Sequence, residues 1–130
     1  DQEGVNTSAN GKQTWNGDAS DKIGQTGWKN VANATQEHSM DVTTDIYQSG
    51  VNNSADVTQK WTHDADAKIV QAGYKNTSTV TQQYGSNQKA DLYQDGWVNS
   101  ATVMQTGSNL SATAVQIGYG NTATFNQTGW

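Results

Sequence analysis

Glutamine recurs along this chain at a nearly constant spacing. Twelve of its fourteen glutamines stand 11 or 12 residues apart, from Gln2 to Gln127. Every second one opens a longer match, Gln-x-Gly-x-x-Asn-x-Ala or Ser, with a full period of 23 residues and one step of 22 between Gln94 and Gln116. A repeat of that length predicts stacked supersecondary units, each burying its apolar face against its neighbours.

The composition excludes several classes of protein. Only 32% of the 130 residues are hydrophobic, which on its own is typical of disorder, but disorder imposes no regular spacing. The net charge of −5 and the absence of arginine argue against nucleic acid or an anionic membrane as partners. No apolar run is long enough to span a bilayer, so we expect no membrane insertion. No signal peptide is recognisable, so we expect either a cytoplasmic chain or a mature secreted one.

Within each repeat, apolar and polar residues alternate with period two. Residues 42–64 place Val42, Thr44, Ile46 and Gln48 on one side of a first strand, and Asn53, Ala55, Val57 and Gln59 on one side of a second. This pattern predicts strand, turn and strand, and it disfavours helix. An up-and-down meander is a rival, but identical residues 23 positions apart favour stacking directly above one another.

We therefore predict an all-β fold, a β-solenoid with about 23 residues per coil and two facing parallel sheets, cross-β in an assembled fibre. A single domain is expected, with a half coil or leader remnant at 1–18 and five repeats. The repeats are 19–41, 42–64, 65–87, 88–109 and 110–130.

Stacked carboxamides are expected to form three ladders, because a buried amide without a partner costs about 1–3 kcal/mol and identical amides can satisfy one another. The first ladder is Gln25, Gln48, Gln71, Gln94 and Gln116. The second is Gln36, Gln59, Gln82, Gln105 and Gln127. The third is Asn30, Asn53, Asn76, Asn99 and Asn121.

Two further columns mark the turns. Glycines at one turn are expected to supply backbone dihedrals closed to other residues. They are Gly27, Gly50, Gly73, Gly96 and Gly118. At the opposite turn stand Asp18, Asp41, Asp64, Asn87 and Asn109, and we expect its acids to point into water because stacked carboxylates repel.

Aromatic residues form two outer columns. One follows the glycines: Trp28, Val51, Tyr74, Trp97 and Tyr119, with Trp130 after Gly129. The other is Trp15, His38, Trp61 and Tyr84. Stacking that stabilises the turns is one interpretation, and a surface that binds a sugar, a dye or a neighbouring fibre is the other.

No pattern in the sequence indicates an enzyme. The carboxylates fall on exposed turn and outer positions, and no nucleophile stands in a motif with a base and an acid. We predict no catalytic residue, no cofactor and no specific metal site, although His38 and His63 could approach each other on adjacent coils. Asp21 falls at an inward position, which suggests a distorted first strand.

These residues resemble the curlin repeat, Ser-x5-Gln-x-Gly-x-x-Asn-x-Ala-x3-Gln, of the curli amyloid subunits of bacterial biofilms. The resemblance covers residues 19–130, and the two glutamines, the glycine and the asparagine recur in all five units. The position six before the first glutamine, usually serine, is Ala19, Val42, Ala65, Gln88 and Leu110 here. The last unit looks most like the closing repeat of the major, fibre-forming subunit, whereas the repeat number also suits the minor, nucleating one.

The resemblance implies a structural subunit of an extracellular functional amyloid, located in a cell-surface fibre or biofilm matrix and active in adhesion. It implies assembly with copies of itself, and a nucleator subunit and an outer-membrane secretion pore as further partners. From the sequence, neither end carries a capping element, so we expect a head-to-tail filament in which all three ladders continue across the joint.

A monomeric β-solenoid that acts as a binding module, of the adhesin or ice-binding type, is the alternative. Ice binding would need one face of regular Thr-x-Thr, and Thr43 and Thr58 are expected to lack a matching column in most repeats.

Overall fold

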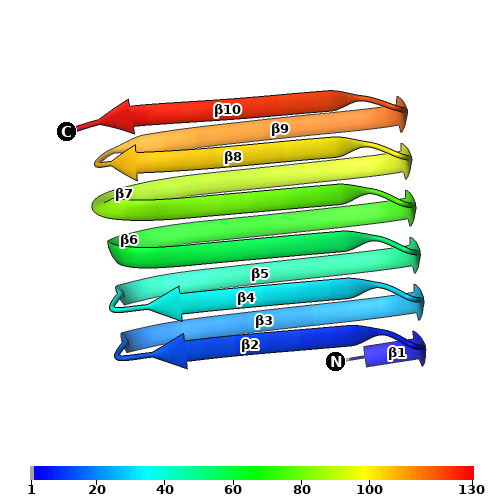
Figure 1. The fold of residues 1–130 in the computed structure, drawn as a ribbon, viewed down its shortest axis with the longest axis horizontal. Helices are drawn as coiled ribbons and strands as arrows, with labels where there is room; N and C mark the ends of the chain where they lie inside the picture. The colour runs from blue at the N-terminus through cyan, green and yellow to red at the C-terminus, as the bar shows by residue number, and fades with distance from the viewer. Residues whose placement is uncertain (1) are drawn as a thin grey trace.

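The predicted β-solenoid is confirmed. A computed structural model describes residues 2–130, so Asp1, the first residue of the predicted half coil, lies outside the described residues. Ten parallel strands follow the chain from bottom to top in Figure 1. They are β1 (Gln2–Val5), β2 (Ser8–Thr14), β3 (Gly17–Trp28), β4 (Val31–Glu37), β5 (Met40–Val51), β6 (Ser54–Tyr74), β7 (Thr77–Trp97), β8 (Ser100–Gly107), β9 (Leu110–Tyr119) and β10 (Thr122–Gly129).

The strands form two layers, and each coil contributes once to each layer. In layer A, β1, β3, β5, the second halves of β6 and β7, and β9 pair in order. In layer B, β2, β4, the first halves of β6 and β7, β8 and β10 pair in order. Every pairing is parallel and aligns residues 22 or 23 apart, so identical repeat positions lie directly above one another.

Two kinds of turn connect the layers. The glycine turn, residues 27–30 and their equivalents, leads from layer A to layer B. The aspartate turn, residues 38–41 and their equivalents, leads back, and β6 and β7 run through it without a break. At the aspartate turn the aromatic position and the aspartate position are both left-handed, for example Trp61 at φ 55° and Asp64 at φ 54°. This pair of residues lets the extended chain reverse direction within four positions.

The core between the layers is thin and partly polar. Small and branched apolar side chains fill its centre, among them Ala34, Ile46, Val57, Ile69 and Leu92. The ladder glutamines from Gln25 to Gln116 flank this apolar centre and are buried as deeply. Because so few large apolar residues are present, the buried amides carry a share of the stabilisation that hydrophobic burial carries in most proteins.

Candidate self-assembly interface: ladders and coil ends

The first glutamine column is a continuous chain of amide hydrogen bonds. Each Nε2 donates to the Oε1 of the glutamine on the next coil, at 2.7 Å from Gln25 to Gln48 and 2.9 Å from Gln71 to Gln94. The column begins at Gln2, which donates to Gln25, and ends at Gln116, which accepts from Gln94. The remaining N–H often crosses the core, as in the 2.9 Å bond from Gln71 to the Ser54 carbonyl oxygen in layer B. The ladder therefore joins the coils and also the layers.

The second glutamine column repeats this arrangement in the same direction. Gln59 donates to Gln82 and Gln82 to Gln105, each at 2.9 Å. Gln13 donates into this column from below, through Gln36, and Gln127 accepts from Gln105 at its top. Both ladders consequently have the same polarity, with amide oxygens facing the first coil and amide N–H groups facing the last.

The asparagine column does not form the predicted amide-to-amide bonds, so that prediction is wrong. The Asn30 Oδ1 accepts from the backbone N–H of Asn53 at 3.0 Å. The Asn30 Nδ2 donates to the carbonyl oxygens of Thr26 and Gly50. Asn53, Asn76 and Asn99 repeat this pattern. An asparagine at this position therefore needs only backbone groups from the coil above it.

The glycine column is required by stacking as well as by dihedral angles. Gly27, Gly50, Gly73, Gly96 and Gly118 have φ between 107° and 116°. A β-carbon added to Gly50 would lie 2.1 Å from the carbonyl oxygen of Gly73 on the next coil. Gly4 occupies the same column in the first coil. Next to the column, Val98 adopts the left-handed conformation at φ 60°, where the equivalent residues are Lys29, Asn52 and Lys75.

The aromatic columns pair only in places. His38 and Trp61 stack with ring centroids 4.1 Å apart and an interplanar angle of 6°, and Tyr74 and Trp97 meet at 6.2 Å in a tilted arrangement. Trp28 lies under the Lys29 ammonium. The other members of the two columns, Trp15, Tyr84 and Tyr119, are exposed.

The placement of Trp130 in the first aromatic column is wrong. Gly129 pairs with Gly107 of β8 in layer B, which puts Trp130 at the other edge of the solenoid from Tyr119. The Gln-x-Gly motif occurs at both turns of the last coil, so the motif alone did not identify the layer to which Trp130 belongs.

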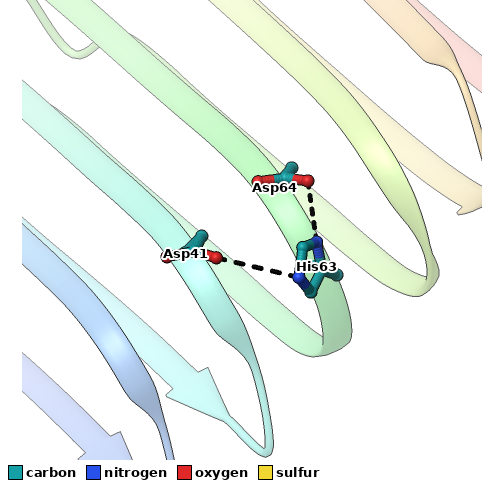
Figure 2. A group of neighbouring side chains, drawn as sticks. All are labelled: Asp41, His63 and Asp64. Atoms are coloured by element: carbon teal, nitrogen blue, oxygen red, sulfur yellow. Dashed lines mark hydrogen bonds and ion pairs between the residues drawn. The ribbon is translucent and has the colours of Figure 1, made fainter.

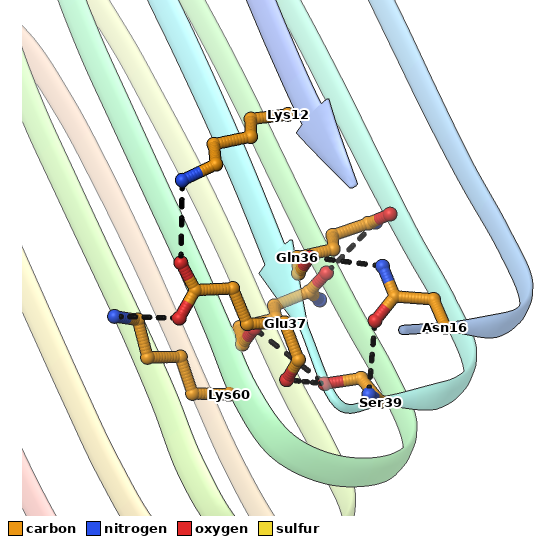
Figure 3. Close-up of polar contacts among 7 residues, drawn as sticks. Lys12, Asn16, Gln36, Glu37, Ser39 and Lys60 are labelled. Atoms are coloured by element: carbon orange, nitrogen blue, oxygen red, sulfur yellow. Dashed lines mark hydrogen bonds and ion pairs between the residues drawn. The ribbon is translucent and has the colours of Figure 1, made fainter. Parts of the chain in front are cut away.

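A polar column at the aspartate turn was not found from the sequence. Asn16 donates from Nδ2 to the Gln36 carbonyl oxygen and accepts at Oδ1 from the Ser39 backbone N–H (Figure 3). One coil higher, the Ser39 hydroxyl accepts from the Thr62 N–H at 3.4 Å. Ser39 and Thr62 are buried, and each stands three residues after a ladder glutamine, which is the signal that could have revealed them.

Outward charges near this turn form ion pairs along the stacking direction. Glu37 lies between Lys60, at 3.0 Å, and Lys12, at 3.8 Å (Figure 3). The hydrogen bond from Lys60 lowers the pKa of the Glu37 carboxyl, with smaller contributions from the charges of both lysines. Because all three side chains contact solvent, the network adds little to stability.

Asp21 does not distort its strand. β3 pairs with β5 in unbroken register from Ala19 to Trp28. The Asp21 carboxyl is half-buried beside Gly11, where its Oδ2 accepts from the Gln13 Nε2 at 3.3 Å. Its Oδ1 has no hydrogen-bond partner among the described residues, and burial raises the pKa of the carboxyl.

The aspartate column points into water, and one part of it forms a cluster. Asp18, Asp41 and Asp64 are exposed, as are Asn87 and Asn109. His63 lies between Asp41 and Asp64, whereas His38 stacks on Trp61, so the two histidines have separate partners.

Threonines form two short columns on the outer surface of layer B, and Thr58 has a matching threonine on two of the five other coils, as expected. Thr35, Thr58 and Thr81 are in register on successive coils, and Thr79, Thr102 and Thr124 form a second column beside them. The columns are interrupted by Met104 and Asn126 in one case and by Asn33 and Asp56 in the other.

Comparison with known families matches the chain to the curlin associated repeat over residues 62–96 and 98–129, just over half of its length. The chain belongs to the curlin repeat family, whose members are structural subunits of extracellular curli-type amyloid and not enzymes. Among curated proteins, no sequence matches the chain. Within residues 2–130, no helix has the length and apolar character needed to cross a membrane.

Proposed function

We propose that this chain is the major, fibre-forming subunit of an extracellular functional amyloid, and that it polymerises head to tail in a biofilm matrix that mediates adhesion. Its partners in this proposal are further copies of itself, a nucleating subunit and an outer-membrane secretion pore. The observation that carries the proposal is that both end coils expose their core faces and that the two exposed faces are complementary.

Exposure of large apolar side chains is greatest in the end coils. In the first coil Val5 is 63% and Trp15 82% exposed, and in the last coil Tyr119 is 75% and Trp130 90% exposed. The inner positions of β10 are only half-buried, whereas the same positions of β8 are buried. Side chains that stack within the solenoid thus lack a neighbour at its ends, as do the backbone groups of the edge strands.

The two ends carry opposite hydrogen-bonding groups. Gln116 and Gln127 each use one N–H on a backbone carbonyl oxygen, and their second N–H finds no acceptor among residues 2–130. At the other end, no donor in the described part of the chain reaches the Oε1 of Gln2 or Gln13. When a second molecule is stacked on the last coil, its Gln2 and Gln13 amide oxygens face the N–H groups of Gln116 and Gln127.

The repeat positions of the two ends also coincide. Gln2 belongs to the column of Gln116, Val5 to that of Tyr119, and Gln13 to that of Gln127. A single translation of the second molecule consequently aligns all three pairs. This contact joins different surfaces and does not close, so it produces a filament.

The asparagine column continues across the joint in a modified form. The first coil has Thr7 at the asparagine position, because it precedes Ser8, which pairs with Val31. Asn121 needs only a backbone N–H and a carbonyl oxygen from the coil above, as its equivalents do within the molecule. Thr7 and Gly4 of the next molecule supply those two groups, so no carboxamide is required there.

The substitution Gln127→Glu tests the joint. A glutamate still accepts the Gln105 bond at 2.8 Å inside the molecule, but it loses the bond to the Ser111 carbonyl oxygen at 2.8 Å and presents an acceptor in place of a donor to Gln13 of the next molecule. We expect Gln127→Glu monomers to add to one end of wild-type seeds and then stop growth there, as measured by imaging single fibres. Gln83→Glu, which adds the same charge at an outward position, is the matched control and should leave growth intact.

A second variant distinguishes loss of the joint from loss of the fold. Gln13→Lys combined with Gln127→Glu places an ammonium against the carboxylate at each joint, and we expect it to restore growth. Deleting residues 110–130 removes the upper surface entirely and should slow or abolish fibre growth. Wild-type thioflavin-T kinetics for the truncated chain or for Gln127→Glu would refute the proposal.

A monomeric binding module is the second candidate, and the threonine columns on layer B favour it. Their hydroxyl and methyl groups repeat at the strand spacing, which suits a regular surface such as ice. In that case the purified chain would stay a single small species at high concentration and would inhibit ice recrystallisation. Fibre growth without that activity excludes this candidate.

A further inference from the structure

Three polar side chains gather at the aspartate turn between two neighbouring coils (Figure 2). Asp41 is the second residue of β5, and His63 and Asp64 lie one coil higher, in the middle of β6. Asp41 and Asp64 both have left-handed backbones, at φ 52° and 54°. About half of each side chain is exposed, so the cluster is open to solvent on one side.

The two ring nitrogens of His63 have different environments. Nδ1 lies 2.7 Å from Asp64 Oδ2, and because an ionised carboxylate only accepts, Nδ1 carries the proton of the neutral ring. Nε2 therefore presents its lone pair, and it faces Asp41 Oδ2 at 3.7 Å. That separation is longer than a hydrogen bond, so the geometry leaves a space between a nitrogen lone pair and a carboxylate oxygen.

We propose that His63 and Asp41 form a binding site for a divalent transition-metal ion of the zinc class, with Asp64 as a positioning residue. Two zinc bonds of about 2.1 Å that meet at a tetrahedral angle place their ligand atoms about 3.4 Å apart, close to the observed 3.7 Å. In zinc sites, the histidine ring nitrogen that does not bind the metal commonly donates its N–H to a carboxylate. The ligand atoms of all three residues lie within 4.8 Å of one another.

The surroundings suit a partly hydrated ion. A polar hollow of about 380 Å³ opens beside the cluster and is lined by Asp41, Asp64 and Asp66, among others. It provides room for water to complete the coordination shell. The imidazole selects zinc, nickel or copper over magnesium and calcium, which prefer oxygen ligands throughout.

An ion at this site joins two coils, because Asp41 and His63 come from different ones. Metal binding therefore stabilises the stacked state relative to the unfolded chain, by an amount that grows with the metal concentration. It also relieves the repulsion between the carboxylates of Asp41 and Asp64. In a fibre one such site recurs per molecule.

The test measures zinc bound to assembled protein. Washed fibres of the full chain are equilibrated with Zn²⁺ in a non-chelating buffer and pelleted, and bound metal is quantified per chain. Wild-type fibres should saturate near one ion per chain. His63→Asn and Asp41→Asn should lose at least tenfold in affinity, and Asp64→Asn several-fold.

The other histidine provides the control. His38→Asn removes an imidazole that has an aromatic partner and should leave zinc binding unchanged. With Cu²⁺, the resonance spectrum should show nitrogen coupling from one imidazole that His63→Asn abolishes and His38→Asn keeps. For any variant that does not assemble, mixed fibres with wild-type chains should lose bound zinc in proportion to the variant fraction.

Equal effects of His38→Asn and His63→Asn would overturn the proposal, as would uptake of zinc that never saturates. Uptake of Mg²⁺ by the same fibres with the same stoichiometry and affinity would also overturn it, because it would identify a diffuse carboxylate surface.

Discussion

Replacing Gln71 by leucine removes one central member of the first ladder. Gln71 is 1% exposed and accepts from Gln48 at 2.7 Å. Its Nε2 lies 2.9 Å from Gln94 Oε1, 2.9 Å from the Ser54 carbonyl oxygen and 3.1 Å from the Ser78 hydroxyl. Gln94 Oε1 keeps a donor, the Ser78 hydroxyl at 2.8 Å. Two groups therefore lose a partner, a buried N–H of Gln48 and the partly buried carbonyl of Ser54.

The expected loss follows from these two groups. Each buried polar group left without a partner costs about 1–3 kcal/mol, and the extra apolar surface of leucine recovers about 1 kcal/mol. The net cost is about 1–5 kcal/mol per molecule, by subtraction of these two estimates. Since 1.4 kcal/mol is a factor of ten in an equilibrium constant, the monomer concentration in equilibrium with fibres should rise at least about fivefold.

The assay is sedimentation of fibres at equilibrium, in enough denaturant to bring the wild-type monomer concentration into a measurable range. Gln83→Leu is the matched control, because Gln83 faces outward and makes only a 3.4 Å bond to Thr106. It should change the monomer concentration by no more than about twofold. If Gln71→Leu behaves like this control, the buried ladder does not stabilise the stack, and the reasoning is wrong.

Three further outcomes are expected from single substitutions. Gly50→Ala should prevent assembly, because its β-carbon would meet the carbonyl oxygen of the next coil at 2.1 Å, whereas Gly120→Ala, with no atom within 4 Å, should cost only the strain of its positive φ. Val98→Asn should stabilise fibres by about 1 kcal/mol, measured by the same sedimentation assay, because asparagine tolerates the left-handed backbone better than a β-branched residue. Burial raises the pKa of the Asp21 carboxyl above that of an aspartate in the unfolded chain, so its contribution to stability is complete below the unfolded pKa and is lost as pH rises through the folded pKa. Asp21→Asn should therefore stabilise the first coils at neutral pH and reduce the pH dependence of the equilibrium monomer concentration, and an unchanged dependence would contradict this assignment.

The fold was predictable because the spacing of identical residues sets the register of the strands. Gln48 and Gln71 are 23 apart, and only a coil of that length puts one above the other. Alternation with period two then fixed the inward face, as Val42, Ile46 and Val57 show by their burial. Both features depend on the order of residues and not on distant contacts, so the sequence alone was sufficient.

The details that the sequence did not reveal depend on exact atomic positions. Whether the Asn30 Oδ1 meets an amide or a backbone N–H depends on how closely the coils approach at the glycine turn, and spacing does not contain that distance. Trp130 follows a Gln-x-Gly that recurs in both layers, so its layer was ambiguous. Asp41 and His63 are 22 residues apart in coils with a 23-residue period, and such diagonal neighbours are missed when only vertical columns are compared.

The axial rise per molecule in the fibre tests the central claim most directly. Residues 2–130 form six coils, as the glutamines from Gln2 to Gln116 show. Head-to-tail stacking that continues the ladders predicts a rise of about 29 Å per molecule, six strand spacings of about 4.8 Å, in a helical reconstruction by electron cryomicroscopy. A rise of about 4.8 Å per molecule, with each chain flattened into a single layer, would contradict the account.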